Sequence, residues 1–294
     1  MSSFFTYVFN GISLGSVYAI IALGYTMVYG IAKMLNFAHG DVIMIGGYVL
    51  FSMIYGSGTN VFAALIVAMV VCTVLGVVIE KVAYKPLREA SSLAVLITAI
   101  GVSILLQNIA QLIFTSQPKM FRNPIKLGSV KMFGANIEGS TILMIVLGII
   151  IVVALSIFIR KTKTGRAMLA VSEDKDAAKL MGINVNTTIT ITFAIGSALA
   201  ALASLLMFNA YPSLIPTSGS MPGIKAFVAA VFGGIGSIPG AMVGGIVLGI
   251  IEVLSGAYIP NGTKLANAIV FVVLIVVHIF KPTGLFGKKI KEKV

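Results

Sequence analysis

Two carboxylates stand inside long apolar runs of this 294-residue chain, where ionised side chains are rare. Asp41 follows a short polar stretch, and Glu252 lies well inside the apolar run 238–259. A charge at the middle of a bilayer costs about 2.5–3.5 kcal/mol on insertion scales, so such residues pair with polar groups or mark a pathway. For Glu252, a hydrogen bond to a neighbouring helix and a place in a pathway are both open interpretations.

The polar stretch before Asp41 predicts an interrupted helix. Asn36, His39 and Gly40 precede Asp41 at the start of an apolar run. Backbone groups freed by a break are tolerated at membrane depth only where they line protein or a water-filled cavity. One interpretation is a broken helix whose N-terminal end faces a pathway. The other is an N-cap near the inner surface, formed by Asn36 or Asp41.

A second interrupted helix is expected after Pro222. The apolar piece 224–236 has thirteen residues, about 20 Å of helix, which is too short to cross a hydrocarbon layer of about 30 Å. We expect a half-helix beginning near Gly223, whose positive end points at whatever occupies the midplane. That geometry suits a carboxylate ligand, and Lys225 either assists it or faces water.

No signature of an enzyme is found in the sequence. There is no Walker A run, no His-Glu-x-x-His, no Gly-x-Ser-x-Gly and no cysteine pair. The single cysteine, Cys72, lies within an apolar run, so a disulfide or a cysteine-based metal site is not available. We therefore expect no catalytic residue, no metal site and no cofactor in this chain.

The elements that carry these residues are predicted by composition. Hydrophobic residues make up 58% of the chain and charged ones 10%, against about 45–50% and 25% in soluble domains. Spans are expected near 5–29, 37–55, 61–82, 93–115, 141–159, 188–209, 238–259 and 265–280. A turn at 236–240 should separate the short piece from the next span. The predicted fold is all-α: a single transmembrane domain over 1–294, a polytopic helix bundle with discontinuous helices.

The basic residues indicate orientation in a membrane and not nucleic-acid binding, although the net charge is +12. With nine crossings that start outside, fifteen of the 21 Lys and Arg fall on the inner side and six on the outer side. Because basic residues are retained in the cytoplasm, the C-terminus should be cytoplasmic. The outer loop 116–140 carries four basic residues against this trend. The count of crossings also depends on whether 224–236 crosses.

The one sizeable inner loop, 160–187, predicts a short helix over 173–181. Ser172 is the expected N-cap, Glu173 and Asp174 occupy the first turn, and Gly182 ends the helix. Its apolar side is formed by Ala177, Ala178, Leu180 and Met181. From these residues alone, the helix could simply lie on lipid headgroups.

Ordered motifs along essentially the whole chain carry a family resemblance. They are GISLGS (11–16), YTMVYG (25–30), NFAHGD (36–41), GRA (165–167), LMGIN (180–184), MPGIKAF (221–227), GGIGSIPGA (233–241) and PTGLFG (282–287). Together they resemble bacterial branched-chain amino-acid ABC transporter permeases of the LivH type. Each glycine-rich motif alone is weakly specific for the family, but the full set of motifs in this order is strongly specific.

The resemblance implies partners and a location. Members of this family act in the bacterial cytoplasmic (inner) membrane with a second related permease and two cytoplasmic ATPases, which bind the ATP and Mg²⁺. A periplasmic or lipid-anchored binding protein delivers Leu, Ile or Val. By this resemblance the helix 173–181 is a coupling helix whose exposed face contacts an ATPase. The implied coupling residues are Gly165, Arg166, Glu173, Asp174, Ala177, Ala178, Leu180 and Gly182.

The expected function is therefore a permease giving alternating access to a branched-chain amino acid, with no chemistry on the substrate. The pathway candidates are Asn36, His39, Gly40, Asp41, Pro222, Gly223, Lys225 and Glu252. Asp41 or Glu252 would pair with the ammonium, and helix ends would hold the carboxylate. The alternatives are a related permease for urea or a short amide, and an ion-coupled carrier acting alone, which the intramembrane carboxylates would suit. A membrane enzyme is the remotest alternative.

Overall fold

The computed structural model describes residues 2–122, 127–132, 135–281 and 283–287. The bundle consists of α1 (Ser2–Ala32), α2 (His39–Phe51), α3 (Val61–Ile79), α4 (Ser92–Phe114), α5 (Gly139–Lys161), α8 (Val185–Ala210), α9 (Ser220–Gly233), α10 (Ile238–Tyr258) and α11 (Gly262–Phe280). Six of these helices are long and apolar enough to cross a membrane. The prediction of an all-α polytopic bundle is confirmed, and each predicted apolar run coincides with a helix.

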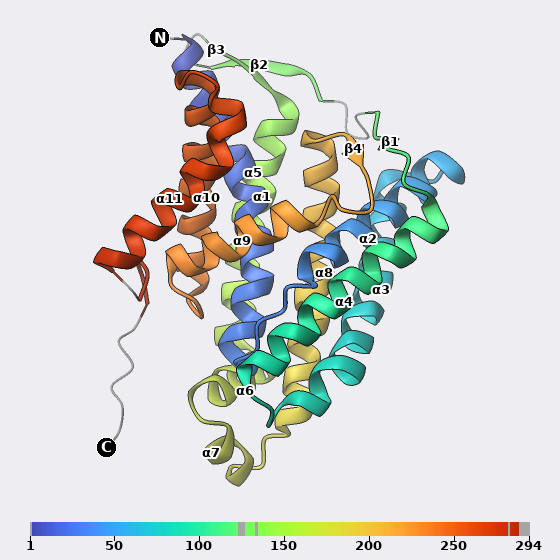
Figure 1. Ribbon diagram of the computed structural model, residues 1–294, viewed down its shortest axis with the longest axis vertical. Coiled ribbons are helices and arrows are strands. Elements are labelled where there is room, and N and C mark those ends of the chain that lie inside the picture. The colour runs from blue at the N-terminus through green and yellow to red at the C-terminus, as the bar shows by residue number, and fades with distance from the viewer. Residues whose placement is uncertain (1, 123–126, 133–134, 282, 288–294) are drawn as a thin grey trace.

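The two ends of the bundle carry different small elements (Figure 1). At one end lie the short helices α6 (Lys163–Glu173) and α7 (Lys175–Leu180). At the other end β2 (Ser129–Met132) pairs antiparallel with β3 (Ala135–Glu138), and β1 (Lys119–Met120) pairs with β4 (Ser213–Leu214). A π-helical turn, η1 (Ser52–Gly56), extends α2, while the π-helical η2 (Glu80–Tyr84) and the 3₁₀ turn η3 (Lys85–Leu87) follow α3.

The orientation of this bundle in the membrane stays a prediction. The 160–187 loop and the strands β2 and β3 lie at opposite ends of the bundle (Figure 1). This agrees with the predicted placement of 160–187 on the inner side and of 116–140 on the outer side. Residues outside the described ranges include Lys126, Pro282 and four lysines counted on the inner side. Those lysines are Lys288, Lys289, Lys291 and Lys293.

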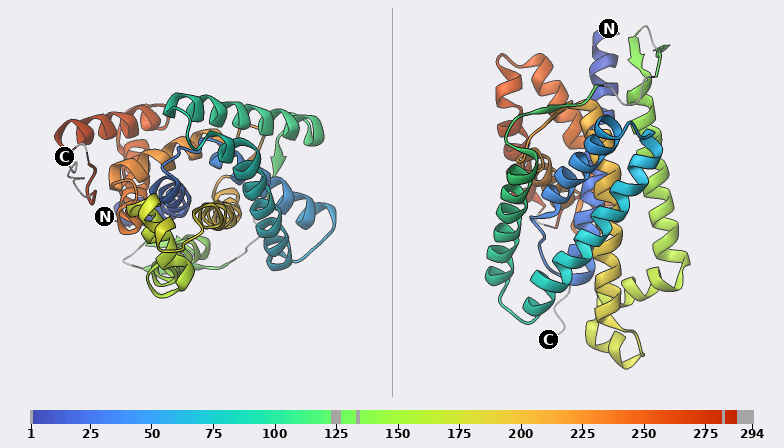
Figure 2. Two further views of the ribbon diagram at one scale, coloured as in Figure 1. Left: turned by 90° about the horizontal axis from the view of Figure 1, so that it is seen from below. Right: turned by 90° about the vertical axis from the view of Figure 1, so that its right-hand side faces the viewer.

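Helix α1 is the centre of the bundle. Its most apolar stretch is 94% buried, against 22% for α4 and 28% for α3 and α5. It packs against α10, α8, α5 and α9, and Figure 2 shows α1 and α8 end-on with the other helices around them. The segment from Val17 to Leu23 is fully covered. Side chains on α1 therefore meet protein, whereas the outer faces of α3, α4 and α5 present apolar side chains to their surroundings.

Glycines set the distance between α10 and its neighbours. Gly245 and Gly249 face α1, whereas Gly240 and Gly244 face α9. A Cβ atom placed at Gly15 of α1 would lie 2.5 Å from the Cα of Ile246, so the two backbones are in direct contact there. Within a bilayer there is no water to drive helix association, so helices associate through close packing at small residues.

Both predicted interruptions are present. After α1 ends, Lys33 has a positive φ of 60°, and the non-helical connector 33–38 leads to α2, which begins about halfway along the bundle (Figure 1). The short α9 lies across the middle of the same view. It ends at Gly233, and the C-cap residue Gly234 has a φ of 103°. The Ser237 hydroxyl accepts a hydrogen bond from the Gly240 N–H at 3.2 Å and so caps α10. The expected turn at 236–240 is confirmed.

The predicted helix 173–181 is wrong in its start and its cap. Ser172 lies within α6, where its hydroxyl donates to the carbonyl of Leu169 at 2.7 Å. The N-cap is Asp174, whose carboxylate accepts from the N–H groups of Asp176 and Ala177 at 2.9 and 3.0 Å. A carboxylate satisfies two free N–H groups and also complements the helix dipole, so it takes the cap in place of the serine. The predicted stop at Gly182 is confirmed by its φ of 79°.

Helix α6 is an element that the sequence patterns did not predict. The Thr162 hydroxyl caps it by accepting from the Gly165 N–H at 3.0 Å. Its apolar face buries Met168 and Val171 against the bundle. Gly165 packs against the end of α5, where a side chain would run into the backbone of Ile159. This end of the bundle is therefore a helix pair, with α6 anchored and α7 beyond it.

The glycine contact between α1 and α10 predicts a strong position dependence of alanine substitutions. A Cβ at Gly249 would meet the backbone of Gly15, whereas a Cβ at Gly256 on the same helix would meet open space. We expect Gly249→Ala to lower the free energy of unfolding by about 1–3 kcal/mol, because the helices must separate. Gly256→Ala should be neutral or stabilising by up to about 1 kcal/mol. Thermal unfolding of the two variants in detergent compares them, and equal melting temperatures would contradict the assigned packing.

Candidate functional site

The two interrupted helices meet at their N-terminal ends. A Cβ at Gly40 would lie 3.1 Å from the Cα of Gly223, and one at Gly223 would lie 3.0 Å from the Cα of Gly40. Gly219, just before α9, packs against the backbone of Gly40 as well. The structure thus brings the predicted segments 36–41 and 222–225 together. The N-terminal ends of two helices, each the positive end of a helix dipole, point into one region of the bundle.

Asp41 lies at this crossing and is 1% exposed. Its Oδ1 accepts a hydrogen bond at 3.0 Å from Nε2 of Gln107, a residue of α4. The same nitrogen lies 3.2 Å from the hydroxyl oxygen of Ser103 and 3.1 Å from that of Ser220 at the start of α9. Gln107 therefore joins α2, α4 and α9. The Ser103 hydroxyl also hydrogen-bonds this carboxylate. The ion pairs found among the described residues do not include Asp41, so both of these donors are neutral.

Glu252 is held differently, by a cation from the same chain. The Lys225 ammonium lies 2.6 Å from Oε1 of Glu252, and the Tyr18 hydroxyl donates to Oε2 at 2.9 Å. The same ammonium is 3.3 Å from the Tyr18 oxygen. These three side chains join α1, α9 and α10. The hydrogen-bonded interpretation of Glu252 is thus the one that the structure favours, and its charge is balanced within the chain.

The remaining pathway candidates line the same break. The Asn36 Oδ1 accepts from the Tyr84 hydroxyl at 2.9 Å, which ties the connector 33–38 to η2. His39 is 1% exposed and packs edge-on against Tyr25 with a centroid distance of 4.9 Å. Its Nε2 has no hydrogen-bond partner among the described residues. Pro222 is half-buried in the first turn of α9.

The space beside the break is small. A cavity of about 10 Å³ lies between the connector and α9, which is room for about one water molecule. It is lined by Tyr25, Tyr29, Leu35, Asn36, Phe227, Ala230 and Ile235. Phe227 also contacts Phe37, with ring centroids 5.3 Å apart. The lining is aromatic and aliphatic, with the Asn36 amide and two tyrosine hydroxyls as polar groups.

Sequence reasoning missed the residues that bond these polar groups. Gln107, Tyr84 and Tyr18 each bond a candidate residue more than forty positions away. Gln107 had a signal, because it stands beside Asn108 in the middle of an apolar run. Tyr18 and Tyr84 had none, since a tyrosine in a membrane helix is ordinary. The sequence therefore indicated the candidate residue of each hydrogen bond but not, in most cases, its partner.

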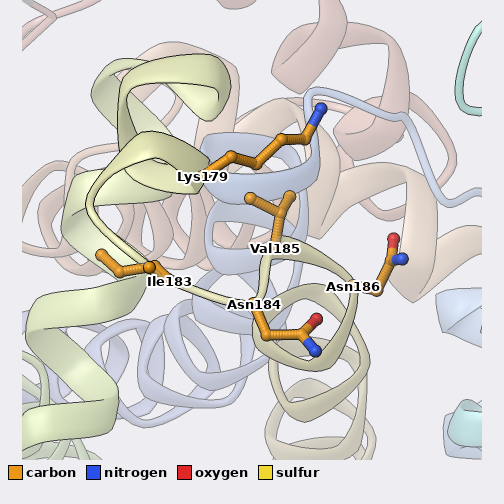
Figure 3. Close-up of a pocket in the computed structure, with 6 residues that line it drawn as sticks. Lys179, Ile183, Asn184, Val185 and Asn186 are labelled. Atoms are coloured by element: carbon orange, nitrogen blue, oxygen red, sulfur yellow. The ribbon is translucent and has the colours of Figure 1, made fainter.

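The loop end of the bundle presents a mixed surface. Of the candidate coupling residues, Arg166, Glu173, Asp174, Ala177, Leu180 and Gly182 are exposed, while Gly165 and Ala178 are buried. Leu180 and Met181 are 89% and 82% exposed. A cavity of about 330 Å³ opens between the end of α7 and the start of α8 (Figure 3). It is lined by Lys179, Gly182, Ile183, Asn184, Val185 and Asn186.

Comparison with known proteins places the chain in a family. The family model described as branched-chain amino acid transport system / permease component matches residues 7–278. The high-affinity branched-chain amino acid transport system permease protein LivH of Salmonella typhimurium is 45% identical, over 99% of this chain and 98% of the relative. The corresponding protein BraD of Pseudomonas aeruginosa is 42% identical, over 97% and 96%. A probable LivH of Methanocaldococcus jannaschii is 28% identical, over 96% and 93%. The chain therefore belongs to the family of permease components of branched-chain amino acid transport systems.

Proposed function

We propose that this chain is the transmembrane permease subunit of an ABC importer in the bacterial inner membrane. It moves branched-chain amino acids inward by alternating access and performs no chemistry on them. The observation that carries the proposal is the family match over almost the whole length of the chain. The crossing of two interrupted helices inside the bundle adds a physical basis, because interrupted helices at mid-bundle are where transporters hold polar ligands.

The charges at the crossing favour a zwitterionic substrate. Glu252 is already neutralised by Lys225, which leaves Asp41 as the buried carboxylate without a cation among the described residues. A bound ammonium would supply that cation, and the N-terminal ends of α2 and α9 would hold a carboxylate. The side chains of Phe37 and Phe227 give an apolar wall for an aliphatic side chain. Opening of the crossing between Gly40 and Gly223 would admit the substrate.

The same proposal implies the partners. Two cytoplasmic ATPases supply the driving force and bind the ATP and Mg²⁺, and a binding protein delivers the substrate at the opposite face. Leu180 and Met181 protrude from α7, so they are the side chains placed to enter a groove on an ATPase. A second related permease completes the transmembrane part.

Uptake by a reconstituted complex tests the proposal. The chain is placed in vesicles with the second permease, the ATPases and the binding protein that copurify with it. We expect leucine uptake that requires ATP and is competed by isoleucine and valine. Uptake of urea or an amide without uptake of leucine would reassign the substrate, and ATP-independent uptake by this chain alone would establish an ion-coupled carrier.

Asp41→Asn should impair transport without harming the fold. The substitution keeps the shape and removes the charge that meets the ammonium, so the loss should match a charged hydrogen bond, about 1.5–3 kcal/mol or roughly 10–100-fold in uptake at low substrate. Because the carboxylate has no cation partner among the described residues, the melting temperature should be unchanged or higher. The exposed Glu89→Gln serves as the matched control. Wild-type uptake by Asp41→Asn would remove this residue from the pathway.

Glu252→Gln should have the opposite signature. It leaves the Lys225 ammonium without its buried partner, which costs about 3–5 kcal/mol of stability. The double variant Lys225→Met with Glu252→Gln removes the stranded charge and should regain most of that loss. Thermal unfolding of Glu252→Gln, Lys225→Met and the double variant measures the coupling. Additive effects of the two substitutions would show that the pair does not hold α9 against α10.

A further inference from the structure

Helix α7 is bonded to the end of the central helix. The Lys175 ammonium, in the first position of α7, donates to the carbonyl of Ala32 at 2.9 Å, across 143 positions of sequence. Ala32 is the last residue of α1. The final carbonyls of a helix lack partners within it and carry partial negative charge, so a lysine ammonium is a favourable partner for them.

The Lys175 ammonium bonds Ala32 although burial and neighbouring positive charges disfavour its charged form. Partial burial is the largest factor that lowers the pKa of Lys175, followed by the nearby charges of Arg88, Lys33 and Lys179. Asp176 acts in the other direction. Without a partner, the ammonium would be more stable in solvent. The hydrogen bond to Ala32 therefore offsets part of the free-energy cost of keeping it partly buried beside other cations.

The interrupted segment begins directly after Ala32. The connector 33–38 starts with Lys33 in a left-handed conformation and leads into α2. Asn36 within it is held by Tyr84. Beyond it, Gly40 and Asp41 form the crossing with α9. The end of α1 is therefore at once the attachment point of α7 and the start of the segment that builds the candidate pathway.

Lys179 on the same helix provides a contrast. Its ammonium pairs with Asp176 at 3.1 Å, within α7, and both side chains are largely exposed. Removing that pair would alter the charge of α7 and leave its bond to α1 in place. Substitutions at Lys175 and Lys179 therefore distinguish the loss of a contact with the bundle from a general change in the charge of α7.

We propose that Lys175 is a positioning residue for transport: by holding α7 to the C-terminal end of α1, it passes the displacement of α7 to the connector 33–38 and so to the α2–α9 crossing. This inference rests on the proposed permease function. It assigns the mechanical link to one side chain and one backbone carbonyl. Contact of α7 with a motor protein, without this link, would move α7 and leave the crossing closed.

The first test compares three variants in the reconstituted complex: Lys175→Met, Lys175→Arg and Lys179→Met. We expect Lys175→Met to assemble and to hydrolyse ATP at a rate within about twofold of wild type while uptake falls at least fivefold. Lys175→Arg keeps a charged donor and should recover uptake. Lys179→Met keeps the bond to Ala32, so its ratio of uptake to ATP hydrolysis should stay at the wild-type value. Unchanged uptake in Lys175→Met overturns the inference, whereas absent uptake in the wild type would instead sink the proposed function.

A second measurement covers the case in which Lys175→Met does not assemble, because the link is restored by a cross-link made in the purified chain before the partner subunits are added. Cysteines replace Lys33, which is exposed, and Lys175, and a short bismaleimide joins them; the native Cys72 is buried. Before cross-linking the double variant should couple poorly, and the cross-link should restore uptake because it replaces the lost bond. Lys33→Cys alone, treated in the same way, is the control. If the cross-linked protein stays uncoupled or loses its residual uptake, the link is not what carries the motion.

Discussion

The close contact of the α2 and α9 backbones is the constraint on which the rest of the bundle depends. Gly40, Gly219 and Gly223 leave no room for side chains between them, so two helices can begin at the same place inside the bundle. Each must then be reached by a non-helical segment, and those segments need polar partners at membrane depth. Tyr84 supplies one for the connector through Asn36. Asn36, His39 and Asp41, which are all buried, accordingly lie in this connector or directly after it.

Asp41 and Glu252 show two ways to carry a carboxylate in such a bundle. Glu252 is balanced by Lys225, and the pair with Tyr18 holds three helices together. Asp41 receives hydrogen bonds from the Gln107 amide and the Ser103 hydroxyl, and such neutral donors compensate a full negative charge more weakly than a cation does. A charge that is balanced within the chain suits a structural role. A charge that is not balanced suits a site that binds a cation. Asp41 is therefore a better candidate than Glu252 for binding a substrate ammonium.

Much of the fold could be predicted because it depends on local composition. The apolar runs indicated the helices, Pro239 and the glycines at 236–240 indicated the turn, and the polar residues from Asn36 to Asp41 indicated the start of α2. The pairings could not be predicted, since Gln107 meets Asp41 and Lys225 meets Glu252 only after the helices pack. The cap of α7 was predicted at Ser172, but Ser172 lies inside α6, and Asp174 caps α7 through two backbone N–H groups.

The most direct test of the account is whether the crossing opens during the transport cycle. Ser220, hydrogen-bonded to Gln107 at the start of α9, is replaced by cysteine in the assembled complex, and its reaction with a small membrane-impermeant thiol reagent is followed. The account predicts slow labelling in the closed state and at least tenfold faster labelling when ATP and loaded binding protein drive the cycle. Equal labelling rates in every state would contradict a pathway at this crossing.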